Sequence, residues 1–200
     1  MKRSDVEALY NICHIDNLPS IIKNGILCYN KAQKLKHKEI HDPIVQGQRK
    51  NKQIPGGGRL HDYANLYFNP RNAMMYKRKN LHKEICILVI EPKILNATNV
   101  VISDTNASSN HSRFYSPKEL DKLDEKLIFA KDWRHDDIIE YWRRKSAVCA
   151  EVLVPSFVPS SFIIGVYVSC NESCEKVKGV LEDSPLYDKI YVNNDLFFQW

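Results

Sequence analysis

Aromatic and amide side chains and one arginine are concentrated in a single stretch of the chain, Asp62-Tyr63-Ala64-Asn65-Leu66-Tyr67-Phe68-Asn69-Pro70-Arg71-Asn72-Ala73-Met74-Met75-Tyr76. Aromatic faces beside the fork-shaped guanidinium of an arginine can hold a flat ring and a phosphate together. The alternative is a packed strand and helix whose Met and Tyr side chains fill the core. That alternative applies to some of these residues, such as Leu66 and one of the two methionines.

A glutamate lies inside an apolar run, Ala150-Glu151-Val152-Leu153-Val154, which ends at Pro155. Burying an ionised carboxylate without a partner is costly, so the side chain of Glu151 needs a cation, access to water or a chemical task. From the residues alone, an edge-strand glutamate that faces water or pairs with an arginine is slightly favoured over a chemical task.

Two basic residues are further candidates for binding. His14 follows an apolar strand and precedes a helix, where it donates hydrogen bonds to a ligand ribose or satisfies a backbone carbonyl. The second role is the more common one for a lone histidine. Arg49 lies in a Lys-rich segment before Gly56-Gly57-Gly58, and nothing local distinguishes it from Lys50 or Lys52.

The elements that must position these residues follow from the apolar pattern. The pattern predicts strands at 9–12, 66–68, 84–90, 150–154, 162–168 and 189–192, and helices at 16–24, 71–79, 136–145 and 172–181. Gly25 is suited to a left-handed helix cap and Pro70 to a first helical turn. Residues 54–58 and 103–116 read as loops. We predict an α+β domain of about five to seven strands, with 84–90 central because it is continuously apolar.

Length and composition are those of an ordinary globular domain. The 200 residues, 44% hydrophobic and 26% charged, suffice for one sizeable core. No apolar run reaches the roughly 20 residues that span a bilayer, and Met1-Lys2-Arg3-Ser4-Asp5 leads into no signal peptide, so we expect a soluble, cytoplasmic protein. The six cysteines are read as reduced thiols, and no metal site is expected.

Charge is distributed unevenly. Residues 1–83 hold 16 Lys/Arg against 6 Asp/Glu, a net charge of +10, whereas residues 84–200 hold 13 against 18, a net charge of −5. A basic half favours binding to nucleic acid or to a diphosphate-bearing ligand, although a solvated Lys-rich surface is the commoner cause of such runs.

Familiar catalytic and phosphate-binding signatures are absent from the sequence. The chain contains no Gly-x-Gly-x-x-Gly after a strand, no Gly-x-x-x-x-Gly-Lys-Ser/Thr and no Gly-x-Ser-x-Gly. The sequence therefore argues against a dinucleotide-binding fingerprint, a P-loop and a serine hydrolase elbow.

Four separated blocks, in order, resemble the DarT toxins, a family of bacterial DNA ADP-ribosyltransferases. The blocks are Tyr10-Asn11-Ile12-Cys13-His14-Ile15-Asp16-Asn17-Leu18, Gly25-Ile26-Leu27, Tyr67-Phe68-Asn69-Pro70-Arg71-Asn72-Ala73-Met74-Met75-Tyr76 and Ala150-Glu151-Val152-Leu153-Val154-Pro155. Ser103-Asp104-Thr105-Asn106-Ala107 and Val158-Pro159 also stand in the family's order. The resemblance covers nearly the whole chain.

The resemblance implies one ADP-ribosyltransferase domain over residues 1–200, a split β-sandwich with flanking helices. It implies transfer of ADP-ribose from NAD, the substrate, to a thymidine or guanosine base in single-stranded DNA, which blocks replication. We classify this as a glycosyl transfer, specifically a pentosyl transfer, and also as a nucleotidyl transfer. The family implies a macrodomain antitoxin as partner.

The resemblance also implies site residues. Glu151 is the catalytic glutamate, and Arg49 matches the functional arginine of an NAD-binding element at Lys31 to Pro55. The residues implied to bind NAD are His14, Asn17, Gly25, Tyr67, Phe68 and Arg71, and those implied to lie near the DNA are Asn106 and Arg144. A carboxylate beside the ribose would stabilise positive charge on the sugar as nicotinamide leaves.

Two alternatives stay open. A related ADP-ribosyltransferase that modifies RNA or protein would keep His14 and Glu151 but not the specificity for DNA. A non-catalytic module would bind nucleic acid through its basic half, with Glu151 in a structural role.

Overall fold

The computed structural model describes residues 1–198. An eight-stranded sheet, in the order β10-β9-β4-β1-β3-β7-β5-β6, forms its centre, and β2 and β8 form a second, two-stranded sheet. The strands of the large sheet are β1 (Leu9–His14), β3 (Tyr63–Tyr67), β4 (Ile85–Ile90), β5 (Val101–Ser103), β6 (Phe114–Tyr115), β7 (Glu151–Pro155), β9 (Ile163–Val168) and β10 (Ile190–Val192). The small sheet pairs β2 (Ile26–Leu27) with β8 (Phe157–Val158).

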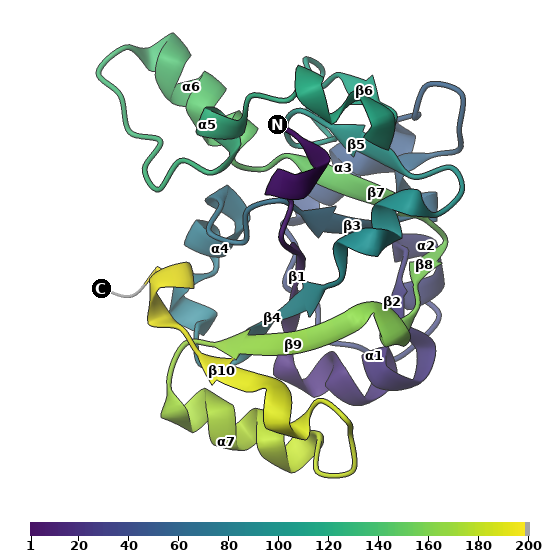
Figure 1. Cartoon of the computed structure of the whole chain (residues 1–200), viewed down its shortest axis with the longest axis vertical. Helices are drawn as coiled ribbons and strands as arrows, with labels where there is room; N and C mark the ends of the chain where they lie inside the picture. The colour runs from purple at the N-terminus through teal and green to yellow at the C-terminus, as the bar shows by residue number, and fades with distance from the viewer. Residues whose placement is uncertain (199–200) are drawn as a thin grey trace.

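Seven α-helices surround the sheets in the described part of the chain. They are α1 (Leu18–Asn24), α2 (Tyr29–Ala32), α3 (Pro43–Asn51), α4 (Ala73–Lys77), α5 (Glu125–Ile128), α6 (Ile138–Ala147) and α7 (Asn171–Val180). Figure 1 shows α1 and α7 beside β9 and β10, and α5 and α6 projecting at the opposite end of the molecule. Short 3-10 turns connect these elements, among them η3 (Leu60–Asp62) and η9 (Asn194–Leu196).

The large sheet is split between β1 and β3. β1 pairs with β4 along all six of its residues but with β3 only at Tyr10 and Tyr67. Each half of the sheet therefore diverges from the other, and side chains of β1 and β3 face the gap. This arrangement confirms the α+β split-sheet fold that the family resemblance implies.

Burial follows the apolar pattern most closely in β4. All six of its residues are buried, and β4 lies inside the sheet between β9 and β1, as the continuous apolar run predicts. The main core lies around this strand and includes Leu9, Leu18, Leu88 and Val177, which join the sheet to α1 and α7.

Several predicted boundaries were wrong for local reasons. The strand predicted at 66–68 begins at Tyr63 and ends at Tyr67, and the helix predicted at 71–79 is α4, with Pro70 outside it. Asn72 caps α4 by accepting hydrogen bonds from the backbone N–H groups of Met74 and Met75, so the helix begins after it.

The prediction of five to seven strands was also too low. The described residues form ten strands, and the four that were not predicted, β2, β5, β6 and β8, have only two or three residues each. Elements this short leave no periodic signal. β6 and the last residue of β5 lie inside the stretch predicted as a loop at 103–116.

Gly25 has the positive φ that was predicted, but for a different reason. Its φ of 77° and ψ of −179° are not those of a left-handed helix cap. A Cβ at this position would lie 2.3 Å from the backbone oxygen of Val158. Glycine is therefore required by the close approach of β8.

Within residues 1–198, no helix is long and apolar enough to cross a membrane. All six cysteines are free thiols.

Candidate active site

A pocket of about 300 Å³ opens where the sheet splits. Asn11 and Cys13 of β1 and Tyr63, Asn65 and Tyr67 of β3 form its floor, while α3, α4 and the segment 37–42 form its walls. The Asn11 side-chain amide donates a hydrogen bond to the backbone oxygen of Asn65 and so joins the two diverging strands at 3.2 Å. The volume lies in the range of small-molecule sites.

A buried ion pair joins α3 to β7 at this pocket. Nη1 and Nη2 of Arg49 each donate to one carboxylate oxygen of Glu151 at 3.0 Å, the two-bond geometry that an arginine makes best. Oε1 of Glu151 also accepts from the backbone N–H of Ala107 at 3.0 Å. Arg49 lines the pocket, whereas Glu151 is 0% exposed and lies behind it.

This geometry contradicts the slightly favoured reading of Glu151 as an edge-strand residue. β7 lies between β3 and β5 inside the sheet, so Glu151 faces no water. The arginine partner that the reading allowed is present, but it is Arg49 and it is equally enclosed. Arg49 is thereby distinguished from Lys50, which is exposed.

The charge of this pair controls the ionisation of its neighbours. Burial by itself would lower the pKa of Arg49, but the Glu151 carboxylate outweighs burial and raises it, so the guanidinium stays charged. Burial and the same carboxylate raise the pKa of Tyr67. Burial raises the pKa of Cys149, which also lines the pocket, to about 11, so its thiol stays protonated and is no nucleophile at neutral pH.

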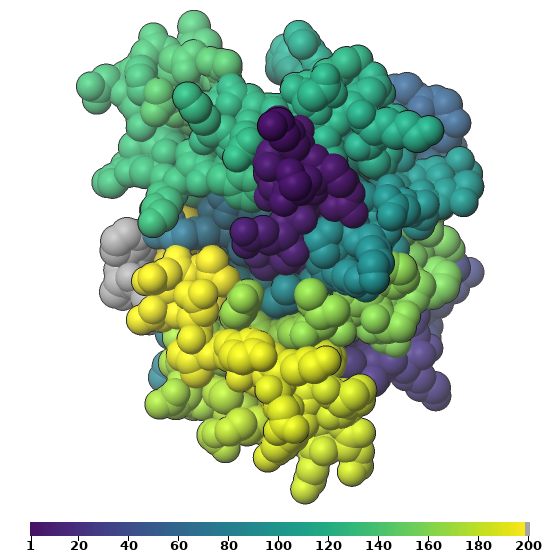
Figure 2. Space-filling view, in the orientation of Figure 1, coloured from purple at the N-terminus to yellow at the C-terminus, as the bar shows by residue number. Residues whose placement is uncertain are grey.

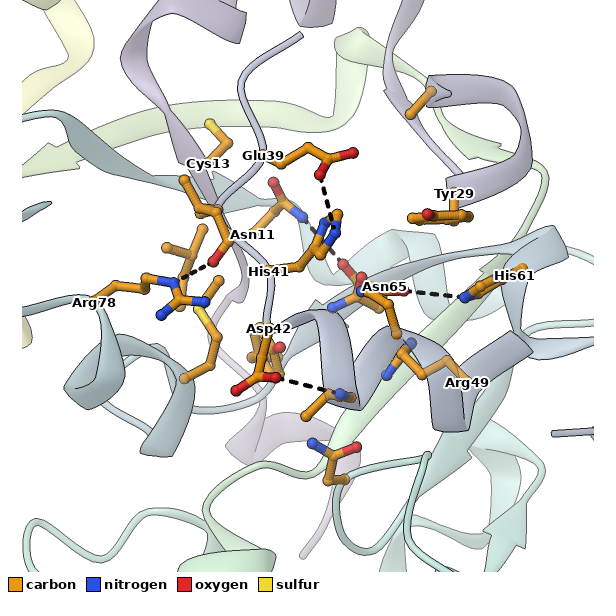
Figure 3. A pocket seen from close by; sticks show the side chains of 18 of the residues that line it. Asn11, Cys13, Tyr29, Glu39, His41, Asp42, Arg49, His61, Asn65 and Arg78 are labelled. Atoms are coloured by element: carbon orange, nitrogen blue, oxygen red, sulfur yellow. Dashed lines mark hydrogen bonds and ion pairs between the residues drawn. The ribbon is translucent and has the colours of Figure 1, made fainter. Parts of the chain in front are cut away.

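Aromatic rings form one wall of the pocket. Tyr29 of α2 stacks on His61 of η3 with ring centroids 4.1 Å apart, and His41 meets the edge of Tyr29 at 5.8 Å. Figure 3 shows Tyr29, His61 and Arg49 on one side of the pocket and Cys13 and Arg78 on the other. Burial is the main cause of the lowered pKa of both His41 and His61, so neutral rings are favoured.

The wall segment 37–42, which we call the lid, is held by contacts at several points. The Asn17 side chain donates to the backbone oxygen of Lys38 and accepts from the Lys38 N–H, both at 2.8 Å. Arg78 donates from Nε to the backbone oxygen of Ile40. Glu39 pairs with His41 at 3.3 Å. The lid therefore depends on contacts from Asn17, just before α1, and from Arg78, just after α4.

α3, which carries Arg49, is stabilised by its N-cap. Asp42 accepts a hydrogen bond from the Ile44 N–H at 2.9 Å and forms an ion pair with Lys77 of α4 at 2.7 Å. An aspartate followed by proline at the first helical position is a recognised start signal. The signal is present at Asp42-Pro43 in the sequence, but α3 was not predicted because the region was interpreted only as a Lys-rich segment.

The structure brings together five of the residues that the sequence analysis selected. Asn17, Arg49, Tyr67 and Asn106 line the pocket, and Glu151 lies directly behind Arg49. The Asn106 side-chain oxygen accepts hydrogen bonds from the N–H and the hydroxyl of Ser108. These two bonds fix the Asn106 side chain within the loop after β5.

Five other selected residues do not line the pocket. Phe68 is fully buried in the main core, and Gly25 packs against β8. Nε2 of His14 contacts Glu84 at 3.2 Å, while its Nδ1 accepts from the Asp16 N–H. The other two, Arg71 and Arg144, lie in the regions described next.

Arg71 and Arg144 lie on other parts of the surface. Arg71 donates to the backbone oxygens of Asp195 and Lys131, both at 2.9 Å. Arg144 lies on α6, near Glu140 of the same helix. Neither residue is among those that line the pocket.

Sequence reasoning missed several pocket residues, among them Asn11, Tyr29, His41, Asn65 and His61. Asn11 and Asn65 stood inside blocks that were quoted for the resemblance or for their amides, and the alternation of β1 and β3 was the available signal. Tyr29, His41 and His61 come from separate elements, and only the fold brings them together. No cluster of three or more His, Cys, Asp or Glu side chains able to hold a metal ion occurs in residues 1–198.

The chain is similar in sequence and in fold to known DNA ADP-ribosyl transferases. Residues 10–198 match the family model described as "ssDNA thymidine ADP-ribosyltransferase, DarT". A DNA ADP-ribosyl transferase–DNA ADP-ribosyl glycohydrolase fusion protein of Thermosipho africanus is 32% identical over 184 residues. The match covers 88% of this chain but only 46% of the fusion protein, so the chain spans about half of that relative.

A second relative, the DNA ADP-ribosyl transferase of Thermus sp. (strain 2.9), is 30% identical over 199 residues, covering 92% of this chain and 93% of that protein. Its structure in complex with ADP-ribosylated ssDNA has a TM-score of 0.84 with this chain, at 25% identity, and covers 97% of both chains. Its structure in complex with carba-NAD+ has a TM-score of 0.78, also at 25% identity, and covers 97% of this chain and 99% of that one.

Proposed function

The chain belongs to the DarT family of ssDNA thymidine ADP-ribosyltransferases, and we propose on this premise that it transfers ADP-ribose from NAD to a base in single-stranded DNA. The observation that carries the proposal is the carboxylate of Glu151, fixed on an interior strand and held by Arg49 at the edge of the pocket. We further propose that residues 1–200 work as a single ADP-ribosyltransferase domain.

The transfer breaks one glycosidic bond and forms another. Nicotinamide leaves C1′ of the ribose with the bonding electron pair, an atom of the acceptor base bonds to C1′, and the base releases one proton. Positive charge develops on the sugar during this exchange, and a fixed carboxylate stabilises it. No phosphoester bond is cut, so the chemistry is a pentosyl transfer, and its classification as nucleotidyl transfer was wrong.

The ion pair with Glu151 suggests that Arg49 controls access to the Glu151 carboxylate. Both carboxylate oxygens of Glu151 are bound by its guanidinium, and only Arg49 faces the pocket. A ribose hydroxyl therefore reaches the carboxylate when Arg49 gives up one of its two bonds. The guanidinium stays charged and remains beside the acceptor base or the diphosphate, where a cation is favourable.

The pocket walls suit the remaining parts of NAD. Tyr29 and His61 offer stacked rings for a base, and Lys77 and Arg78 supply positive charge for the diphosphate. Of the residues that the resemblance selected for NAD, Asn17 and Tyr67 are in position to contact it. His14, Gly25 and Phe68 act by holding the surrounding strands in place.

The acceptor strand enters beside the loop that follows β5 and along α6. Asn106 lines the pocket, and α6 leads into Glu151 through the buried residues 147–150. α6 presents Arg144 together with Trp142, which is 57% exposed and has Lys145 Nζ 4.8 Å from its ring centroid. Exposed aromatic rings and cations are the usual contacts for single strands.

Mass spectrometry of oligonucleotides tests the proposal. The protein is incubated with NAD and single-stranded homopolymers, and an added mass of one ADP-ribose unit is expected on oligothymidine, the base in the family's description. Modification of oligoguanosine alone would assign the other base. NAD consumption without modified DNA would favour an RNA or protein acceptor, and no consumption would favour a binding module.

We also propose that the protein is a cytoplasmic toxin with a macrodomain glycohydrolase as antitoxin. The fusion of transferase and glycohydrolase in the Thermosipho africanus relative supports this pairing. Modified template bases would block replication, so expression in bacteria is expected to stop growth and Glu151→Ala to relieve the block. Normal growth with active protein present would contradict the toxin role.

A further inference from the structure

Arg71 belongs to a cluster of contacts that lies apart from the pocket. Its guanidinium lies over the ring of Phe198, with Cζ 4.0 Å from the ring centroid. Nε and Nη1 of Arg71 donate to the backbone oxygens of Asp195 and Lys131. One planar side chain thus joins the segment after β10 to the segment after α5.

The second part of this cluster is a group of three rings. Trp133, Tyr76 and Phe198 meet edge to face, with centroids 5.2 to 6.1 Å apart. Such pairs contribute stability beyond the area that they bury. We call Arg71, Tyr76, Trp133 and Phe198 the aromatic clamp.

The clamp is the main anchor of the segment that leads into α6. Residues 129–137 contain neither helix nor strand, and within the described range 129–139 only Trp133 is buried. Asn69 fixes the start of the segment by donating to the backbone oxygen of Ile128 at 2.8 Å. The start of α6 therefore depends on Trp133, and its end depends on the connection to β7.

α5 contributes Ile128 to the main core and α6 packs Tyr141 on the cluster that contains Trp133, whereas their other residues, apart from buried Ala147, are exposed or half-buried. Figure 2 shows the residues around α5 and α6, in green at the upper left, separated by a notch at the top from the teal residues before them, with the yellow C-terminal segment lower on the same side. The N-terminus of α6 has 61% and 73% exposure at Ile138 and Ile139. Helices that pack through so few residues are positioned by their anchors.

The wall of the NAD pocket has anchors of its own. α4 carries Tyr76 on its outer side, but it is fixed by the Asn72 cap, by buried Met75 and by the ion pair between Lys77 and Asp42. Loss of the clamp is therefore expected to displace α6 and to leave α4 in place.

We propose that the aromatic clamp positions α6 for the acceptor strand, and that Arg71 and Phe198 are positioning residues for DNA without contacting NAD. This inference rests on the proposed function, in which α6 presents the DNA. It replaces the implied contact of Arg71 with NAD by a contact with residues 131 and 195.

The test separates the two substrates. In Phe198→Ala, transfer to oligothymidine at saturating NAD is expected to fall about a hundredfold, the scale of a misplacement of 1 Å. The Kd for NAD, measured by titration without DNA, is expected to stay within about twofold of the wild-type value. An unchanged Kd would also show that the variant is folded. Arg71→Lys should also lower transfer to DNA, because an ammonium group can neither stack on the ring of Phe198 nor donate two hydrogen bonds in the planar geometry of a guanidinium.

A structural readout and two controls complete the experiment. Limited trypsin digestion should cut faster at Lys131 and Arg134 in Phe198→Ala, because both flank Trp133. Phe198→Tyr keeps the ring and should restore transfer, while Tyr191→Ala, on exposed β10, should match the wild type.

Two results would overturn the clamp. One is wild-type transfer by Phe198→Ala. The other is a weakened Kd for NAD in Arg71→Lys with DNA transfer unchanged at saturating NAD, which would return Arg71 to the donor site. A wild-type protein that modifies no DNA would instead overturn the proposed function.

Discussion

Among single residues, the ion pair between Arg49 and Glu151 makes the largest electrostatic demand on the fold. Both groups are removed from water, and such a pair often contributes no more stability than apolar side chains of the same size. The two parallel bonds and the Ala107 N–H recover much of the desolvation cost. We infer that the pair is present for catalysis, because stability alone does not require it.

Substitution of the pair tests this inference. Glu151→Ala leaves a buried guanidinium without a partner and is expected to lower the free energy of unfolding by about 3 kcal/mol. The double variant Arg49→Met/Glu151→Leu removes both charges, so its unfolding free energy should return to within about 1 kcal/mol of the wild type. Urea unfolding measures both values. A double variant less stable than Glu151→Ala would contradict this account.

Among the elements, the sequence was informative where burial is continuous and uninformative where it is not. β4 and β7 follow from their apolar runs, and β7 places Glu151 directly behind Arg49 of the pocket. Arg49 had no local signal, because its burial comes from the docking of α3 on β7. The family resemblance assigned Phe68 to the site together with Tyr67, but Phe68 directly follows the last residue of β3, and neighbouring residues of an extended chain point in opposite directions, so its ring lies in the main core.

We expect the lid, which lines the pocket, to control the binding of NAD. Asn17→Ala removes both hydrogen bonds to Lys38, each contributing about 1 kcal/mol, so the KM for NAD is expected to rise by up to about thirtyfold. Global stability should change little, since only the lid is released. Asn24→Ala on α1 also deletes an amide, outside the pocket, and serves as the matched control. Equal KM values for the two variants would refute the role of the lid.

For the whole molecule, part of the positive charge of residues 1–83 lies at the pocket. The cationic residues that line the pocket, Lys38, Arg49, Lys77 and Arg78, all come from the basic residues 1–83. The Lys and Arg residues of the pocket therefore come from the basic part of the chain, whereas α6 belongs to the acidic half. Net charge favoured an anionic ligand but did not say where in the fold it binds.

Acidification is expected to destabilise the whole fold through the pocket. The pKa values of His41 and His61 lie below their ordinary value of 6.5, so below that pH the unfolded chain binds more protons. The contribution of the two neutral, buried histidine rings to the free energy of unfolding is complete above pH 6.5 and is lost as the pH falls below that value. Urea unfolding at about pH 7.5 and about pH 5.5 should show a smaller loss in His41→Gln/His61→Gln than in the wild type. Equal losses would exclude these histidines as the cause.

We infer that the protein transfers ADP-ribose to single-stranded DNA, with Glu151, held by Arg49, as the catalytic carboxylate. The most direct test is mass spectrometry of oligothymidine after incubation with NAD and either wild-type protein or Arg49→Met/Glu151→Leu, whose matched stability excludes unfolding as an explanation. We expect one added ADP-ribose unit with the wild type and none with the double variant. An equal yield of modified DNA from both proteins would contradict the claim.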